Sequence, residues 1–223
     1  MSIILPSYKI IIFDWDGTVM DSVSKIVACM QAAFCDVGIP IPSTEAVKDI
    51  IGLGLSDAIL QLHSDLQKKH LDLIKDRYSH HYVHQNNTAS PLFPQASETL
   101  DALSKKGYDL AIATGKSRKG LDRVLSELEM KELFAFTRCA DETKPKPHPA
   151  MVEEILEESG LRSHQAVVVG DTEHDMAMAK SAMVDRIAVS YGAHHVDRLK
   201  AYNPVLLIDN LEEILPWLND TGL

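Results

Sequence analysis

The chain has 223 residues and a formal net charge of −10, because 32 acidic side chains outnumber 22 basic ones. This excess of acid argues against a general nucleic-acid-binding protein, which needs a basic face. It does not exclude a phosphorylated substrate, because a few local cations or a bound metal reverse the field within a site. No apolar stretch reaches the roughly 18 residues of a membrane-spanning helix, so we expect no membrane partner.

The cysteines and the first residues bear on the cellular compartment. Cys29, Cys35 and Cys139 include no closely spaced pair, and three thiols cannot all pair within one chain. Such thiols are typical of a reduced protein. Residues 1–6 lack the basic segment and the small-residue cleavage site of a secretory signal. We therefore expect a cytoplasmic protein.

The most informative segment begins with the apolar run of residues 10–13, a candidate strand. Asp14 and Asp16 follow it directly, and Gly17 opens a turn. In an open α/β sheet, ligands bind outside the carboxyl ends of the strands. Two carboxylates this close repel each other, which favours a shared proton or a bound cation such as Mg²⁺. A plain turn is the alternative, and a calcium-binding EF-hand is excluded because its twelfth position is Lys25.

Short apolar runs typical of strands alternate with amphipathic runs typical of helices along most of the chain. The candidate strands span residues 10–13, 110–113, 135–139, 166–169, 186–189 and 205–208. Helices with one apolar face lie between several of them. This alternation predicts an α/β fold in which helices cover a mostly parallel sheet.

One long segment interrupts this alternation. Residues 20–88, between the first and second candidate strands, have helical apolar spacing but no convincing strand, and residues 86–91 are typical of a linker. We expect residues 20–88 to form an inserted helical cap domain. The α/β core then consists of residues 1–19 and 89–223.

Two further strand ends carry residues suited to a phosphate. Thr114 and Gly115 follow the second strand, where a hydroxyl and free backbone N–H groups before a helix form a phosphate cradle. Capping of that helix by Ser117 is the structural alternative, and it is compatible with a cradle. A later loop, stiffened by prolines, presents Lys144 and Lys146, either of which it would hold in place.

The last of these strand ends again carries paired acids. Asp171 follows the apolar run at 166–169, and Asp175 lies about one helical turn later, so both carboxylates can face the same site. Capping of the next helix by Asp171 is the alternative. An acid pair, a hydroxyl, a lysine and a second acid pair thus occur in order at strand ends. This joint pattern favours one catalytic site.

Taken together, these motifs resemble those of the haloacid-dehalogenase-like (HAD) phosphohydrolases. The similarity covers nearly the whole chain, with motifs on residues 10–18, 110–115, 146–149 and 167–175. The resemblance implies a three-layer Rossmann-like α/β core with a mostly parallel sheet. The position of residues 20–88 is similar to that of the C1-type caps of the family, which implies a cap that opens and closes over the core.

Within the family, three segments look most like phosphoglycolate-phosphatase-like members. They are residues 13–18, 51–55 and 146–149. The resemblance implies that the partner is a small phosphorylated metabolite, with phosphoglycolate as the leading candidate. The core motifs recognise only the phosphate, so we expect the cap to select the non-phosphate part of the substrate. Monomer and homodimer both remain open.

The resemblance also implies catalytic roles. Asp14 would be the nucleophile that forms an aspartyl-phosphate, and Asp16 would be the general acid and then the general base. Thr114 and the Gly115 amide would bind the phosphoryl oxygens. Lys146, favoured over its neighbour by its Lys-Pro-x-Pro context, would pair with the nucleophile and the phosphate.

The implied cofactor is Mg²⁺. The resemblance assigns it to four aspartates, which are Asp14, Asp16, Asp171 and Asp175. Asp16 would contribute its backbone carbonyl, and Asp175 would bind the metal either directly or through another ligand. Such a cation is needed because a carboxylate and a phosphate monoester repel each other.

Alternatives remain both within the family and outside it. A true haloacid dehalogenase is disfavoured, because those enzymes resemble this fold but lack the second aspartate, here Asp16, and need no Mg²⁺. A phosphomutase of the β-phosphoglucomutase type keeps both aspartates and stays open, as does a pyrophosphatase or nucleotidase. A non-catalytic binding module is the alternative from a different class.

Several histidines have less specific interpretations. His80, His81 and His84 lie near the end of a predicted helix that leads into a polar linker, which favours a solvated helix end over a metal cluster. His194 and His195 are expected at the surface.

Two basic residues near the second strand have two interpretations. Lys116 and Arg118 follow the expected phosphate cradle. They either add positive charge near the substrate or form a solvated helix start, and the sequence does not decide between the two.

Overall fold

The computed structural model describes residues 8–220. Residues 1–7 and 221–223 lie outside this range, and with them the segment considered for a secretory signal and both ends of the expected core. Within the described range, six strands form one sheet in the order β3-β2-β1-β4-β5-β6. They are β1 (Ile10–Phe13), β2 (Asp109–Thr114), β3 (Phe136–Cys139), β4 (Ala166–Gly170), β5 (Asp185–Val189) and β6 (Leu206–Ile208). Every neighbouring pair is parallel, so the predicted α/β class and all six strands are confirmed.

The two central strands are buried on both faces. All residues of β1 and β4 are buried, as is usual for parallel strands that helices cover from both sides. Ile11 and Phe13 belong to the apolar core on one face, whereas Ile10 and Ile12 belong to the core on the other. The sheet is therefore the middle one of three layers.

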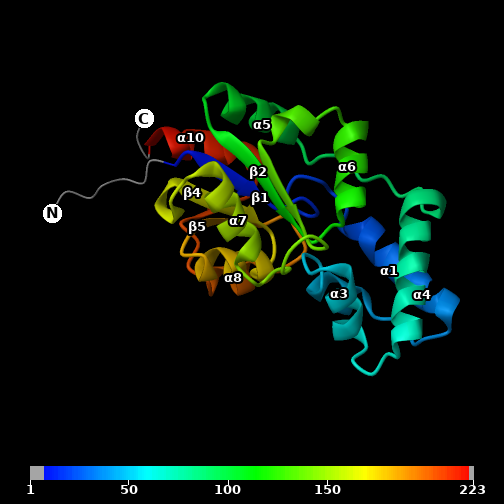
Figure 1. Ribbon diagram of the computed structural model, residues 1–223. Helices are drawn as coiled ribbons and strands as arrows, with labels where there is room; N and C mark the ends of the chain where they lie inside the picture. Colours follow the sequence, from blue (N-terminus) through cyan, green and yellow to red (C-terminus); the bar gives the residue numbers. More distant parts are fainter. Residues whose placement is uncertain (1–7, 221–223) are drawn as a thin grey trace.

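Helices supply the two outer layers (Figure 1). The core that contains Ile11 receives side chains from α5 (Ala96–Lys105), α6 (Arg118–Glu127) and α10 (Ile214–Asp220). The opposite core receives side chains from α7 (Ala150–Ser159) and α8 (Glu173–Ser181). The shorter elements are α9 (Val196–Lys200) and the 3₁₀ turns η2 (Lys131–Leu133), η3 (Ser163–Gln165) and η4 (Leu211–Glu213).

The segment between β1 and α5 is helical and packs around a core of its own. It contains α1 (Val23–Val37), α2 (Thr44–Asp49), α3 (Leu55–Leu62), α4 (Lys68–His80) and the π-helical turn η1 (His81–Gln85). Their apolar side chains form one separate cluster. In Figure 1 these helices lie beside the sheet rather than on either of its faces. This arrangement agrees with an inserted cap, whose boundaries remain a prediction.

Serine and glycine residues mark several helix ends, and the predicted cap at Ser117 is confirmed. Ser43 caps α2 and Ser117 caps α6, each accepting a hydrogen bond from a backbone N–H group of the first turn. The helices α1 and α7 end at the C-cap residues Gly38 and Gly160. Helix α4 changes to the π-helical turn η1 at its end.

No helix within the described residues is long and apolar enough to cross a membrane.

The buried position of β1 predicts a large loss of stability on truncation. Ile11 is fully buried, so Ile11→Ala should lower the free energy of unfolding by about 2–5 kcal/mol, through lost burial and the cavity it leaves. Ile41 is 56% exposed, so Ile41→Ala should change it by less than about 0.5 kcal/mol. Urea unfolding of both variants measures the difference. Equal losses would contradict the packing described for β1.

Candidate active site

Three adjacent strands end at one place on the edge of the sheet. β1 lies between β2 and β4. Asp14 follows β1, Thr114 ends β2 and Asp171 follows β4. All three side chains are buried. Lys146 reaches them from the loop between β3 and α7, so the parallel topology collects in one site the residues that the sequence placed at separate strand ends.

The ammonium group of Lys146 lies between two buried carboxylates. Its Nζ is 2.5 Å from Asp14 Oδ1 and 2.6 Å from Asp175 Oδ1. Burial acts to lower the pKa of Lys146, but the attraction of Asp14 and Asp175 outweighs it and raises that pKa, so the group is charged. Lys144 is exposed. Of the two candidate lysines, the one that enters the site is therefore Lys146.

The Asp171 carboxylate accepts two hydrogen bonds and lies close to the backbone of Gly17. Its Oδ1 accepts a hydrogen bond from the Thr18 hydroxyl at 2.9 Å, and its Oδ2 accepts one from the Ala193 N–H at 2.7 Å. A Cβ atom at Gly17 would lie 2.2 Å from Asp171 Oδ2, and Gly17 has a φ of 91°. Both the space and the backbone angle therefore require glycine in the turn after the first acid pair.

The helix after Asp171 is capped by its neighbour. Thr172 is the N-cap residue of α8, and its hydroxyl accepts a hydrogen bond from the Asp175 N–H. In return, Asp175 Oδ2 accepts a hydrogen bond from the Thr172 N–H at 3.0 Å. The interpretation of Asp171 as the cap is therefore wrong. The capping box also fixes Asp175, whose other carboxylate oxygen lies against Lys146.

Three buried carboxylates lie close enough to hold a cation. One oxygen each from Asp14, Asp171 and Asp175 lies within 4.8 Å of the others. Burial raises the pKa of Asp14 well above its usual range, and burial together with the charge of Asp175 raises the pKa of Asp171 to about 7. Asp14 Oδ2 is buried without a hydrogen-bond partner in the described part of the chain. A hard divalent cation would relieve this repulsion, and such cations prefer carboxylate oxygens, so the residues present fit such a metal.

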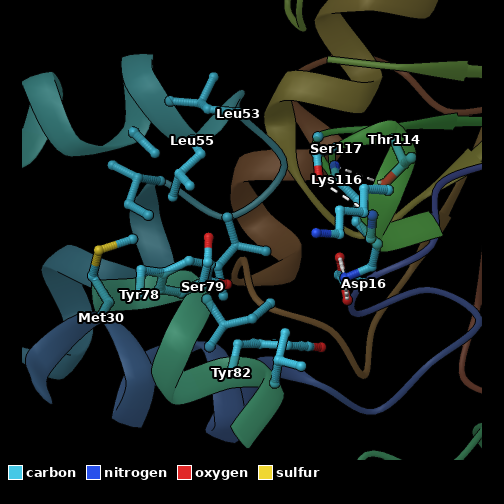
Figure 2. Close-up of a pocket in the computed structure, with 18 of the residues that line it drawn as sticks. Asp16, Met30, Leu53, Leu55, Tyr78, Ser79, Tyr82, Thr114, Lys116 and Ser117 are labelled. Atoms are coloured by element: carbon cyan, nitrogen blue, oxygen red, sulfur yellow. Dashed lines mark hydrogen bonds and ion pairs between the residues drawn. The ribbon is translucent and has the colours of Figure 1, made fainter. Parts of the chain in front are cut away.

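Asp16 has a different environment from the other three aspartates. Its Oδ1 accepts a hydrogen bond from the Ser22 hydroxyl at 2.6 Å, and its Oδ2 lies 2.8 Å from Lys116 Nζ. Figure 2 shows this pair beside Thr114. The carboxylate of Asp16 is not part of the three-aspartate cluster. A contribution of its backbone carbonyl to a metal stays a prediction.

Lys116 is therefore a site residue that the sequence left undecided. Its side chain is only 11% exposed, so the interpretation as a solvated helix start is wrong for this residue. The sequence feature that pointed to a role for Lys116 in the site is its position directly after Thr114 and Gly115, the expected phosphate cradle. Arg118 instead pairs with Asp122 and Glu142, which leaves it without a contact to Asp16.

The phosphate cradle lies directly beneath a loop of the helical segment. The Thr114 hydroxyl accepts a hydrogen bond from the Lys116 N–H at 3.2 Å. A Cβ atom at Gly115 would lie 2.6 Å from the carbonyl oxygens of both Gly52 and Leu53. Only glycine allows the loop between α2 and α3 to approach this closely.

The prediction that His194 lies at the surface is wrong. His194 is 2% exposed, its Nδ1 accepts a hydrogen bond from the Glu173 N–H, and its ring faces that of His174. Burial lowers the pKa of His194, so it is neutral. No sequence pattern indicates this burial, because the contact depends on the free N–H groups at the start of α8. His195 is exposed, as expected.

The histidines at the end of the helical segment have different surroundings from one another. His81 Nε2 lies 2.8 Å from Asp36 Oδ2, whereas His80 and His84 are exposed. Within residues 8–220, the cluster with metal-ligand spacing is the one formed by the three aspartates. His80 and His84 thus agree with the expected solvated helix end, whereas the His81 side chain is only 14% exposed.

A cavity of about 760 Å³ adjoins these residues. Asp14, Asp16, Thr114 and Lys116 line its core side, and α1, α3, α4 and η1 line the other. Figure 2 shows Leu53, Leu55, Tyr78 and Tyr82 on the helical side. A substrate bound at the carboxylates would therefore extend toward the helical segment.

The chain is similar in sequence to known proteins. The profile of the haloacid dehalogenase-like hydrolases matches residues 11–189. A phosphoglycolate phosphatase of Vibrio parahaemolyticus is 28% identical over 215 residues, which cover 93% of this chain and 94% of the relative. The probable phosphatase IndB of Dickeya dadantii is 32% identical over 210 residues, covering 92% and 91% respectively.

The structure is also similar to a solved structure of a related protein. The crystal structure of a predicted phosphoglycolate phosphatase from Haemophilus somnus superposes with a TM-score of 0.86 at 27% identity, covering 95% of this chain and 98% of that protein. The fold that positions the aspartate cluster is therefore similar to the fold of that protein. The chain belongs to the haloacid dehalogenase-like hydrolase family.

The fit of a cation to the aspartate cluster predicts stabilisation by metal. Mg²⁺ at about 100 times its dissociation constant should stabilise the fold by about 2.7 kcal/mol. For a chain of this size, the melting temperature should rise by roughly 5–10 °C. Asp14→Asn removes a buried carboxylate, so this variant should be at least as stable as the wild type in EDTA and should gain less from Mg²⁺.

Calorimetry in EDTA and in Mg²⁺ measures both effects. Asp101→Asn is the matched control, because Asp101 is exposed on α5. An equal Mg²⁺ shift in the wild type and in Asp14→Asn would contradict the assignment of the cluster.

Proposed function

We propose that this chain is a Mg²⁺-dependent phosphatase that hydrolyses a phosphate monoester with Asp14 as the nucleophile. The observation that carries the proposal is the position of the Asp14 carboxylate, whose Oδ1 faces Lys146 while Oδ2 has no hydrogen-bond partner in the described chain. A carboxylate that is anchored through one oxygen and free at the other suits an attack on phosphorus.

The phosphatase class predicted from the sequence is confirmed by the family and by the relatives. Two of the proteins compared above carry the name phosphoglycolate phosphatase. These names make 2-phosphoglycolate the reference substrate for any assay of this chain.

The proposed reaction has two steps that use both acids of the first pair. In the first step, Asp14 Oδ2 forms a bond to phosphorus while the bond between phosphorus and the alcohol oxygen breaks, and Asp16 donates its proton to that oxygen. In the second step, Asp16 takes a proton from a water whose oxygen attacks phosphorus. This step releases inorganic phosphate and restores the Asp14 carboxylate.

Three residues are proposed to hold the phosphoryl group during these steps. The Thr114 hydroxyl and the Gly115 N–H would donate hydrogen bonds to its oxygens, and the Lys146 ammonium would neutralise part of its charge. The position of Thr114 at the end of β2 and the charged state of Lys146 support these roles.

The metal is proposed to be held by the three clustered aspartates, with the backbone carbonyl of Asp16 as a further ligand. When bound, Mg²⁺ would neutralise phosphate charge so that a carboxylate can approach phosphorus. The raised pKa values of Asp14 and Asp171 support a site built for a cation.

Residues 20–88 are proposed to act as a cap over this site, with residues 1–19 and 89–223 as the core. Their separate apolar core supports this division. An ion pair between Asp49 of the helical segment and Arg198 of the core joins the two parts. The cytoplasmic location and the choice between monomer and homodimer remain predictions from the sequence.

The mechanism predicts loss of turnover on removal of one charge. Asp14→Asn should lower phosphate release by several orders of magnitude, because an amide is a far weaker nucleophile than a carboxylate. EDTA should abolish turnover, and Mg²⁺ should restore it. Steady-state phosphate release from a panel that includes 2-phosphoglycolate measures this, with Asp101→Asn as the control. Full turnover by Asp14→Asn would reject the proposed nucleophile.

The contact between Lys116 and Asp16 predicts a positioning role. Lys116→Met should lower kcat by about 10- to 100-fold, because a small displacement of an acid–base group is costly. The Michaelis constant should change much less. Arg118→Met is the matched control, since Arg118 lies two residues further on, at the start of α6, and pairs with Asp122 and Glu142 instead of Asp16. A change confined to the Michaelis constant would instead mean that Lys116 only binds substrate.

A further inference from the structure

The cavity beside the catalytic carboxylates has two unlike ends. Its core end carries the charged and polar groups of the site, among them Asp14, Asp16 and Thr114. Its other end is formed by the helical segment, and the side chains there are mostly apolar or aromatic. Figure 2 shows the two ends facing each other. The polar end suits the phosphate, so the apolar end faces the alcohol part of a monoester.

Leu53, Leu55, Tyr78 and Tyr82 provide much of the apolar wall. All four are only partly buried in the absence of a ligand. The rings of Tyr78 and Tyr82 lie 5.8 Å apart and tilted against each other. Covering this surface with an apolar group would remove it from water, which is favourable roughly in proportion to the area buried. A ring in the ligand would also find favourable aromatic contacts.

The helical wall places no lysine or arginine among the described residues that line the cavity, although Lys25 of α1 lies 4.9 Å from the centre of the Tyr82 ring. Within the described residues, the ionisable groups of its share of the lining are Asp76, His80, Tyr78, Tyr82 and His84. Because Asp76 is an acid, it would repel a substrate carboxylate. A glycolate group would therefore lack a charge partner among the described lining residues on this side.

The cations on the opposite wall already face other groups. Lys116 pairs with Asp16. Arg123 lies over the ring of Tyr82 and 3.7 Å from Glu127. Lys119 is exposed at the surface of α6. None of the three forms a preorganised partner for a carboxylate deep in the cavity.

The size of the cavity, like its lining, favours a bulky alcohol part. A volume of about 760 Å³ falls within the range of roughly 300–1,000 Å³ that is typical of sites for drug-sized ligands. A two-carbon acid would fill only a small part of it. The unfilled remainder would leave apolar wall exposed to water.

We propose that the preferred substrate is a phosphate monoester of a bulky, uncharged and largely apolar alcohol, with an aromatic ring or a branched aliphatic group seated against Leu53, Leu55, Tyr78 and Tyr82. This inference rests on the proposed phosphatase function and departs from the expectation of phosphoglycolate. It assigns the choice of substrate to the helical segment and the chemistry to the strand ends.

The test compares three alkyl esters of matched chemistry. Benzyl phosphate carries a ring, ethyl phosphate is small and neutral, and 2-phosphoglycolate is small and charged. The expected kcat/KM for benzyl phosphate exceeds that for either small ester by at least about tenfold, since filling an apolar pocket discriminates at that level. Equal or higher kcat/KM for 2-phosphoglycolate, with Mg²⁺-dependent and Asp14-dependent turnover intact, would overturn this inference alone. Absence of turnover of all three esters would overturn the proposed function as well.

A variant that fills part of the cavity provides a second test. Leu55→Trp adds volume to the apolar wall, so the ratio of kcat/KM for benzyl phosphate to that for ethyl phosphate should fall at least about tenfold. Leu73→Trp is the matched control, because Leu73 is on α4 and outside the cavity lining, and its ratio should match the wild type. An unchanged ratio in Leu55→Trp would show that the alcohol part does not occupy this wall. Because the readout is a ratio on one protein sample, a partly unfolded variant still decides the question.

Discussion

The buried ammonium group of Lys146 is the contact on which the site depends. A charge taken out of water is costly unless it is paired, and Lys146 is paired with Asp14 on one side and Asp175 on the other. One positive charge does not balance three buried carboxylates, however, because Asp171 lies in the same cluster. The remaining negative charge is the physical reason why the centre suits a divalent cation and then a phosphate.

The order of the strands brings these groups together. β1 lies between β2 and β4, and all three run in the same direction. Their carboxyl ends therefore deliver Asp14, Thr114 and Asp171 to one point, although these residues are far apart in the chain. Lys146 needs no strand of its own, because its loop leads from β3 into α7 beside the same edge. The catalytic arrangement thus follows from a parallel sheet with helices on both faces.

Much of this could be predicted from the sequence, for a physical reason. Strands buried on both faces are continuous apolar runs, and the residue after a run is fixed at the strand end by the covalent chain. Lys116 and His194 could not be placed in this way. The direction of the long Lys116 side chain is set by Asp16, and the burial of His194 is set by the start of α8. Both partners are distant in sequence, so only the folded chain reveals them.

The two ends of the cavity are built on different hydrophobic cores. The wall from the helical segment belongs to one apolar cluster, whereas the strands that carry the carboxylates are supported by two others. Substitutions that share no neighbours tend to have additive effects on stability. Changes in the wall can therefore accumulate without weakening the support of the carboxylates. This separation provides an evolutionary route by which one hydrolytic centre acquires new substrates through drift in the helical segment alone.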